Sequence, residues 1–137
     1  MSDGDINNTE LLEQSWFIDL DWYRLNRRSF TTLAQRSLCP KCYKRLQVKT
    51  GEIAAAGLFK AIKGCCSKEP GFISGRLSLL ESMFRLFLAN GNQPLNLEAL
   101  VGQLRKWRGE GQHRPAAGVV SRLLASDQYY GLRPVQK

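Results

Sequence analysis

Two cysteines separated by two residues, Cys39 and Cys42, are the pair of side chains in this sequence best placed to do chemistry. The chain has 4 cysteines, and the other two, Cys65 and Cys66, follow after a stretch of 22 residues. Structural zinc sites gather thiolates in this way, from a short Cys-X-X-Cys turn and a second segment of the chain. The spacing therefore predicts one structural zinc ion bound by Cys39, Cys42, Cys65 and Cys66.

The adjacent pair Cys65-Cys66 is the unusual half of this ligand set, because neighbouring side chains diverge unless the backbone turns sharply between them. Gly64 offers the conformational freedom for such a turn. If one of the two thiolates does not reach the metal, the single histidine, His113, is the next candidate for the fourth position. Two other interpretations stay open, namely ordinary buried thiols and a redox dithiol at Cys39 and Cys42, the latter without a thioredoxin-type strand and helix around it.

The length and composition are those of a small protein with a modest core. The chain has 137 residues, of which 43% are hydrophobic. It contains no run of about 18 apolar residues, so we expect no membrane span, and its N-terminus lacks the organisation of a signal peptide. We expect a cytoplasmic protein, where reducing conditions keep thiols available for a metal.

Charge is distributed unevenly along the chain. The formal net charge is +8, yet the first 23 residues contain six Asp and Glu and no Lys or Arg, so the remaining residues carry +14. Such an excess attracts polyanions and is typical of proteins that bind nucleic acid. Residues 1–15 form an acidic head that we expect to be disordered, because its low hydrophobicity cannot offset the entropy of ordering.

The elements that would position the first two cysteines are helices. An apolar stripe predicts a helix from Trp16 to Leu38 that leads into Cys39. A second helix, about residues 52–63, ends at Gly64 beside the second cysteine pair. We assign residues 16–72 to a helical zinc-binding unit, which ends in the Pro- and Gly-containing segment 67–75.

Three further helices are predicted in residues 73–137. Ser78-Leu-Leu-Glu81 has the form of a capping box and opens the first, and Asn96 caps the second after the extended link 93–95. Pro115 suits the first turn of the third. The side chains expected to be buried in this third helix are Val119, Val120, Leu123 and Leu124. Residues 129–135 are expected to form a strand beside the link.

The stretch from Phe84 to Leu100, FRLFLANGNQPLNLEAL, resembles the first-helix, turn and second-helix block of winged helix-turn-helix proteins. The resemblance covers about residues 73–135 and implies that the third helix enters the major groove of DNA. It places the candidate nucleic-acid contacts on the residues around the loop before that helix and on the helix itself: Arg105, Lys106, Arg108, Arg114, Ser121 and Arg122. Winged-helix domains also serve as protein-interaction modules, and the single terminal strand and few exposed polar positions here keep that alternative open.

No catalytic constellation is present, since the chain has one histidine and neither a Gly-rich phosphate loop nor a nucleophile elbow. The sequence thus predicts a non-enzymatic, mainly α protein, with a helical zinc-binding N-terminal unit and a C-terminal winged-helix-like unit of three helices and a minimal β-strand pair. The predicted function is binding of nucleic acid, with double-stranded DNA favoured. A protein-interaction module within a larger assembly is the alternative, and a dithiol redox protein is a third.

Overall fold

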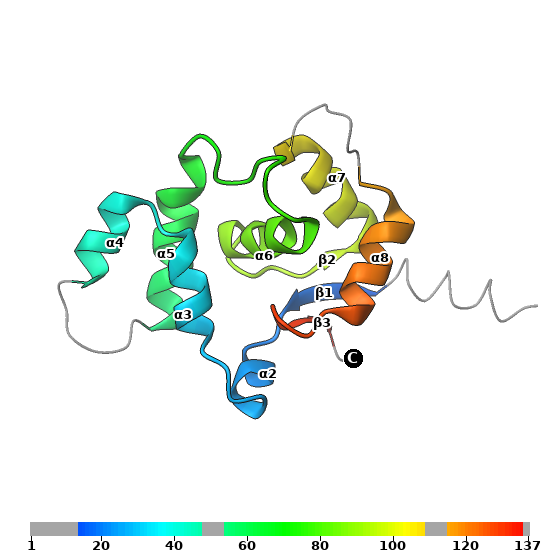
Figure 1. Cartoon of the computed structure of the whole chain (residues 1–137), viewed down its shortest axis with the longest axis horizontal. Coiled ribbons are helices and arrows are strands. Elements are labelled where there is room, and N and C mark those ends of the chain that lie inside the picture. The colour runs from blue at the N-terminus through cyan, green and yellow to red at the C-terminus, as the bar shows by residue number, and fades with distance from the viewer. Residues whose placement is uncertain (1–13, 48–53, 109–114, 136–137) are drawn as a thin grey trace, which may run out of the picture.

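The computed structural model describes residues 14–47, 54–108 and 115–135, and this part of the chain is mainly helical, as predicted (Figure 1). In chain order the elements are β1 (Ser15–Ile18), α2 (Leu20–Leu25), α3 (Phe30–Ala34), the 3-10 helix η1 (Gln35–Ser37), α4 (Pro40–Gln47), α5 (Ala55–Gly64), the 3-10 helix η2 (Cys66–Lys68), α6 (Leu79–Ala89), β2 (Leu95–Asn96), α7 (Leu97–Arg108), α8 (Ala117–Ser126) and β3 (Leu132–Pro134). None of the described helices is long and apolar enough to cross a membrane. Residues 1–13 of the predicted acidic head lie outside the described residues, and the prediction is wrong at Ser15, which begins β1 and pairs with Asn96.

A three-stranded antiparallel sheet joins the first and last described segments of the chain. β1 is the central strand, with β2 on one side and β3 on the other, and Trp16 is paired with both Leu95 and Pro134. The sequence predicted a pair formed by residues 129–135 and the link 93–95. Both segments enter the sheet, but that pairing is wrong, because β1 lies between them.

The predicted helix from Trp16 to Leu38 is wrong at its N-terminal end, which is β1. Trp16 and Ile18 are buried there and alternate with the half-buried Ser15 and Phe17, the period of a strand. The side chain of Asn92 accepts a hydrogen bond from the Ile18 N–H at 2.8 Å and donates one to the Ile18 carbonyl at 2.9 Å. Partners far along the chain therefore decide this conformation, which local periodicity does not reveal.

The rest of the predicted helix is divided into α2 and α3. The Asp19 carboxylate caps α2 by accepting from the Asp21 N–H at 3.1 Å. Arg27 then has a φ of +54°, in the left-handed region, which interrupts the helical path. The Ser29 hydroxyl starts α3 by accepting from the Thr32 N–H at 3.1 Å. Polar caps thus mark the start of each short helix.

The helix starts predicted for α6 and α7 are confirmed. The Ser78 hydroxyl accepts from the Glu81 N–H at 3.1 Å, and the Asn96 side-chain oxygen accepts from the Ala99 N–H at 2.8 Å. Gly91, with a φ of +74°, follows α6 and allows the chain to leave the helix. Each cap residue and the N–H group that it binds are three residues apart, so the sequence alone reveals the start of these helices.

The third predicted helix, α8, begins two residues after Pro115. Three of the four side chains predicted to be buried in it are buried or half-buried: Val120, Leu123 and Leu124. The prediction for Val119 is wrong, since its side chain is 36% exposed. An apolar residue is therefore presented on the open side of α8.

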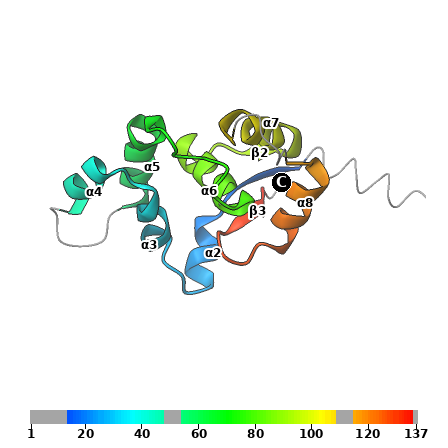
Figure 2. The same ribbon diagram turned by 45° about the horizontal axis from the view of Figure 1, so that its top comes forward.

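The buried side chains of the described residues form one core cluster that continues across the predicted boundary between residues 72 and 73. Helices α3, α4 and α5 gather at one end of the molecule and α7 and α8 at the other, with α6 and the sheet between them (Figures 1 and 2). Phe84 of α6 links the halves, since its ring lies 6.2 Å from that of Phe30 and 5.2 Å from that of Tyr130. The division of the chain into units of residues 16–72 and 73–137 stays a prediction.

Candidate metal centre

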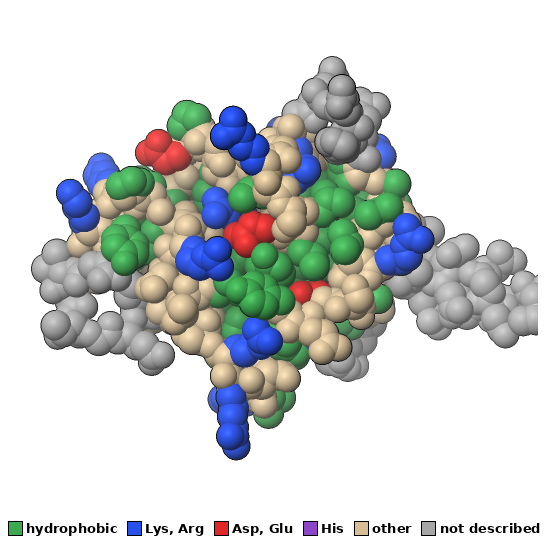
Figure 3. Space-filling model, in the orientation of Figure 1, with side chains coloured by type: hydrophobic (Ala, Val, Ile, Leu, Met, Phe, Trp, Pro, Cys, Tyr) green, Lys and Arg blue, Asp and Glu red, His purple; other side chains and the backbone are tan. Residues whose placement is uncertain are grey.

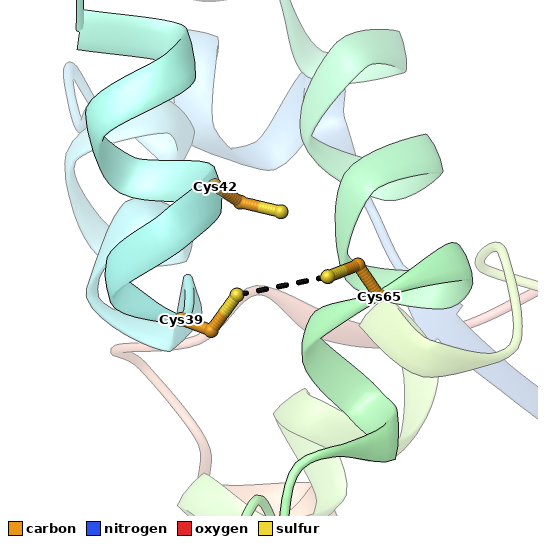
Figure 4. A group of neighbouring side chains, drawn as sticks. All are labelled: Cys39, Cys42 and Cys65. Atoms are coloured by element: carbon orange, nitrogen blue, oxygen red, sulfur yellow. Dashed lines mark hydrogen bonds between the residues drawn. The ribbon is translucent and has the colours of Figure 1, made fainter.

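The four cysteines lie where two helical segments meet. Cys39 directly precedes α4 and Cys42 lies in the first turn of that helix, while Cys65 follows the last residue of α5 and Cys66 begins η2. Figure 4 shows the side chains of Cys39, Cys42 and Cys65 pointing toward one another from the two segments. The end of a helix, α5, lies beside the cysteines as predicted, but the Cys39-Pro-Lys-Cys42 segment is the start of helix α4 rather than a turn, and the sequence analysis did not predict that helix.

The distances between the sulfur atoms suit a metal ion. The Sγ atoms of Cys39, Cys42 and Cys65 all lie within 4.8 Å of one another, and those of Cys39 and Cys65 are 3.8 Å apart. The Cys66 Sγ lies 3.4 Å from that of Cys39. A tetrahedral ion with metal–sulfur bonds of about 2.3 Å separates its ligand sulfurs by about 3.8 Å. The Sγ atoms of Cys39, Cys42 and Cys65 are thus close enough to hold a metal ion, and the Cys66 Sγ lies beside them as the candidate fourth ligand.

The adjacent cysteines both reach the cluster because the backbone turns at Cys65 itself. Cys65 leaves the helix with φ −136° and ψ −62°, while its N–H still donates to the Ala61 carbonyl at 2.9 Å. Gly64 is the last residue of α5, and no heavy atom lies within 4 Å of the position that a Cβ would take there. The turn attributed to Gly64 in the sequence is therefore made one residue later.

The electrostatic surroundings favour one thiolate in particular. The backbone N–H of Cys42 lowers the pKa of the Cys39 thiol to about 7, an effect that burial opposes. Burial raises the pKa of the Cys42 and Cys66 thiols, and the hydrogen bond with Cys42 raises that of Cys65. A metal would have to displace the protons of these thiols, so its affinity falls as pH falls.

Two hydrogen-bond donors other than the cysteine thiols stabilise negative charge on the sulfur atoms. The Cys39 N–H donates to the Cys66 Sγ at 3.1 Å, and the guanidinium of Arg45 donates to the Cys42 Sγ at 3.5 Å. Hydrogen bonds of this kind orient metal ligands and stabilise their charge. The sequence analysis missed Arg45, although a spacing of three residues on a helix places Cys42 and Arg45 on one side.

All four cysteines are free, and no two of them form an isolated dithiol. The sulfur of Cys39 has both Cys65 and Cys66 within 3.8 Å. A redox role of Cys39 and Cys42 stays a prediction. The alternative ligand His113 lies outside the described residues.

The predicted nucleic-acid contacts are found in different situations around α7 and α8. The Arg108 guanidinium donates to the Leu77 carbonyl at 2.8 Å and the Ser82 hydroxyl at 2.9 Å, so these donors already have partners. Arg105 is exposed and donates to the Pro115 carbonyl at 3.3 Å. Lys106 and Arg122 are also exposed, whereas Ser121 is half-buried. Arg114 lies outside the described residues. Contact of these residues with nucleic acid stays a prediction.

No protein-family model, no curated protein and no solved structure matches this chain. The residues themselves therefore have to indicate the function.

Proposed function

We propose that this protein binds nucleic acid and that one zinc ion, held by its four cysteines, supports the fold. The observation that supports the metal is the convergence of four sulfur atoms from two separate segments at distances close to those of a tetrahedral thiolate set. Thiolates favour zinc over magnesium and calcium, which take oxygen ligands. Four protein ligands leave no open coordination position, so the role of the ion is structural.

The position of α4 explains what a structural ion would do here. Cys42 is the one buried side chain among the described side chains of α4, while Lys41, Tyr43 and Lys44 are exposed. Apart from Cys42, the half-buried Leu46 is the apolar side chain of α4 that packs against the core, so apolar burial holds this helix only in part. A zinc ion that joins Cys39 and Cys42 to Cys65 and Cys66 would supply the missing link, and its removal should release α4 before the sheet.

Excess positive charge supports the nucleic-acid part of the proposal. Beyond residue 23 the sequence carries +14, and the ion pairs among the described residues use three cations: Arg24, Arg85 and Arg133. Lys and Arg side chains are spread over the face drawn in Figure 3 and outnumber Asp and Glu there. Cations without carboxylate partners attract phosphates and release counterions on binding.

A protein-interaction module is the second candidate, and one observation favours it. Val119 is 36% exposed on α8, where Ala117 and Gly118 are exposed as well. In the winged-helix interpretation this helix would face the DNA, yet this stretch offers small and apolar groups. Such a surface suits a protein partner better than base edges.

Binding measured across salt concentrations separates the two candidates. The probes are duplex DNA, single-stranded DNA, RNA and heparin, an unrelated polyanion. Neutralisation of phosphates gives a steep, linear fall of log affinity with log salt, with a slope of about −0.9 per phosphate contact for duplex DNA and about −0.7 for single strands. Affinity for heparin alone, or no salt-dependent binding to any nucleic acid, would reject the nucleic-acid proposal and leave the interaction module.

A further inference from the structure

Two hollows in the surface of the molecule share one lining residue, Arg36. The first, about 220 Å³, is lined by residues that include Arg28, Arg36 and Tyr129. The second, about 490 Å³, lies beside the cysteine cluster and has Arg36, Lys41 and Arg85 in its wall. Because Arg36 belongs to both, the two hollows adjoin. The surface defined by Arg28, Arg36, Lys41, Arg85 and Tyr129 is named the arginine track below.

The arginine track carries unbalanced positive charge. Three of its cations have no carboxylate partner among the described residues: Arg28, Arg36 and Lys41. Arg85 is paired with Glu81 at 3.0 Å, and Glu69 is the one carboxylate in the walls of the two hollows. The track therefore attracts anions and has several unpaired donors to bind them.

Aromatic rings accompany these cations at one end of the track. The guanidinium carbon of Arg28 lies 5.3 Å from the centre of the Tyr129 ring and 5.8 Å from that of Trp22. Tyr129 is 45% exposed, although buried Asp127 fixes its backbone by accepting from the Tyr129 N–H at 3.0 Å. An unpaired base can stack on an aromatic ring that is exposed, fixed in place and next to a planar guanidinium.

A buried hydroxyl in the wall of the larger hollow lacks a partner. Ser37 is 5% exposed, and its Oγ has no hydrogen-bond partner in the described part of the chain. Buried polar groups are normally satisfied, so an orphaned hydroxyl in the wall of a hollow indicates that something else binds there. After a rotation of the Ser37 side chain toward the hollow, a phosphate oxygen bound there near Arg36 and Lys41 would accept that hydrogen bond.

From this geometry we infer that the arginine track binds single-stranded nucleic acid, with a base stacked on Tyr129 and phosphates bound by Arg36 and Lys41. A duplex keeps its bases paired and stacked within itself, so it would leave the exposed ring and the hollow unused. This inference rests on the proposed nucleic-acid function and moves the main contact surface away from α8. It also places the bound strand beside the metal centre, since Cys39 and Cys66 line the larger hollow.

The test measures binding of the full chain to oligo-dT and oligo-U of about 15 nucleotides and to a duplex of the same length. The variant R28Q/R36Q is compared with K44Q/R76Q, which removes the same charge from exposed side chains outside the track. Tyr129→Ala is compared with Tyr43→Ala, because Tyr43 on α4 is 44% exposed, close to the 45% of Tyr129. Thermal melting of each variant checks that it is folded.

We expect Tyr129→Ala to weaken single-strand binding about 5- to 150-fold, the range for loss of one stacked base, with little effect of Tyr43→Ala. R28Q/R36Q removes one of the two phosphate-binding cations, Arg36, and should lower the salt slope by about 0.7, whereas K44Q/R76Q should leave it unchanged. Equal effects of the track and control variants, or a preference of the wild type for duplex, would overturn the track while leaving nucleic-acid binding intact. If the wild type binds none of the three probes, the proposed function fails and the inference fails with it.

Discussion

Replacement of Arg108 by alanine should unfold this protein more easily rather than simply remove a phosphate contact. Its guanidinium makes two well-formed hydrogen bonds, to the Leu77 carbonyl at 2.8 Å and the Ser82 hydroxyl at 2.9 Å, while those to the carbonyls of Ser74 and Gly75 are at 3.4 and 3.5 Å. A bond to a charged group contributes about 1.5–3 kcal/mol. Taking the lower value for a half-buried side chain, and two bonds, gives a loss of about 3 kcal/mol.

The assay is urea unfolding of the wild type, Arg108→Ala and Arg105→Ala, followed by circular dichroism. Arg105 is the matched control, because its exposed side chain makes one hydrogen bond of 3.3 Å, to Pro115, and its loss should change the free energy of unfolding by less than about 0.5 kcal/mol. Arg108→Lys should lie between alanine and wild type, because both short bonds come from the single Nη1 atom and an ammonium, which has three donors, can replace them in part. An Arg108→Ala protein as stable as the wild type but weaker on DNA would refute the structural role and restore the sequence-based one.

Three further outcomes follow from particular contacts. Gly131→Ala should lower the free energy of unfolding in urea by about 3 kcal/mol, because Gly131 has a φ of +70° and an added Cβ would lie 2.6 Å from the Tyr23 ring. The control Gly64→Ala adds a Cβ that meets no atom, so its stability should be unchanged or slightly higher. Equal stability changes in the two variants would contradict this explanation. Tyr23→Phe removes the hydrogen bond to the Tyr130 carbonyl and should cost about 1 kcal/mol at pH 7. Burial raises the pKa of Tyr23, so the stability that this group contributes is present below its unfolded pKa of about 10 and is lost as pH rises above that value. The free energy of unfolding of the wild type should therefore fall by up to about 1.4 kcal/mol between pH 10 and 11 through this group. The fall for Tyr23→Phe should be smaller by the same amount. Arg45→Ala should weaken metal binding about 10-fold in a chelator competition, whereas Lys44→Ala should not, and equal affinities would remove Arg45 from the support of the site.

The features that the sequence predicted well depend on residues close together in the chain. The caps at Ser78 and Asn96 bind N–H groups three residues away, so spacing alone reveals them. The cysteine cluster was predicted for a related reason, since the ligand spacing of metal sites is itself a sequence pattern. The turn that directs Cys66 toward the other cysteines was not predicted correctly, because it depends on the backbone conformation of Cys65 rather than on a glycine.

The features that were missed depend on distant partners. Residues 16–18 look helical in isolation, but both edges of β1 are occupied by strands from the second half of the chain. Arg108 looked like a free cation, whereas its acceptors are 26 to 34 residues away in sequence. The arginine track joins Arg28 to Tyr129, and no periodicity links residues so far apart. Tertiary contacts between residues far apart in the sequence determine the strand β1, the hydrogen bonds of Arg108 and the arginine track, and a short stretch of sequence does not contain them.

X-ray absorption at the zinc edge, on protein purified without added metal, tests the central claim most directly. One zinc per chain surrounded by four sulfurs at about 2.3 Å is the predicted result, with the Cys66→Ser variant losing one sulfur from that shell. A shell of three sulfurs and one nitrogen would contradict the assignment of all four cysteines and indicate His113 instead. Protein that contains no zinc, and whose melting profile does not change in a chelator, would contradict the metal centre itself.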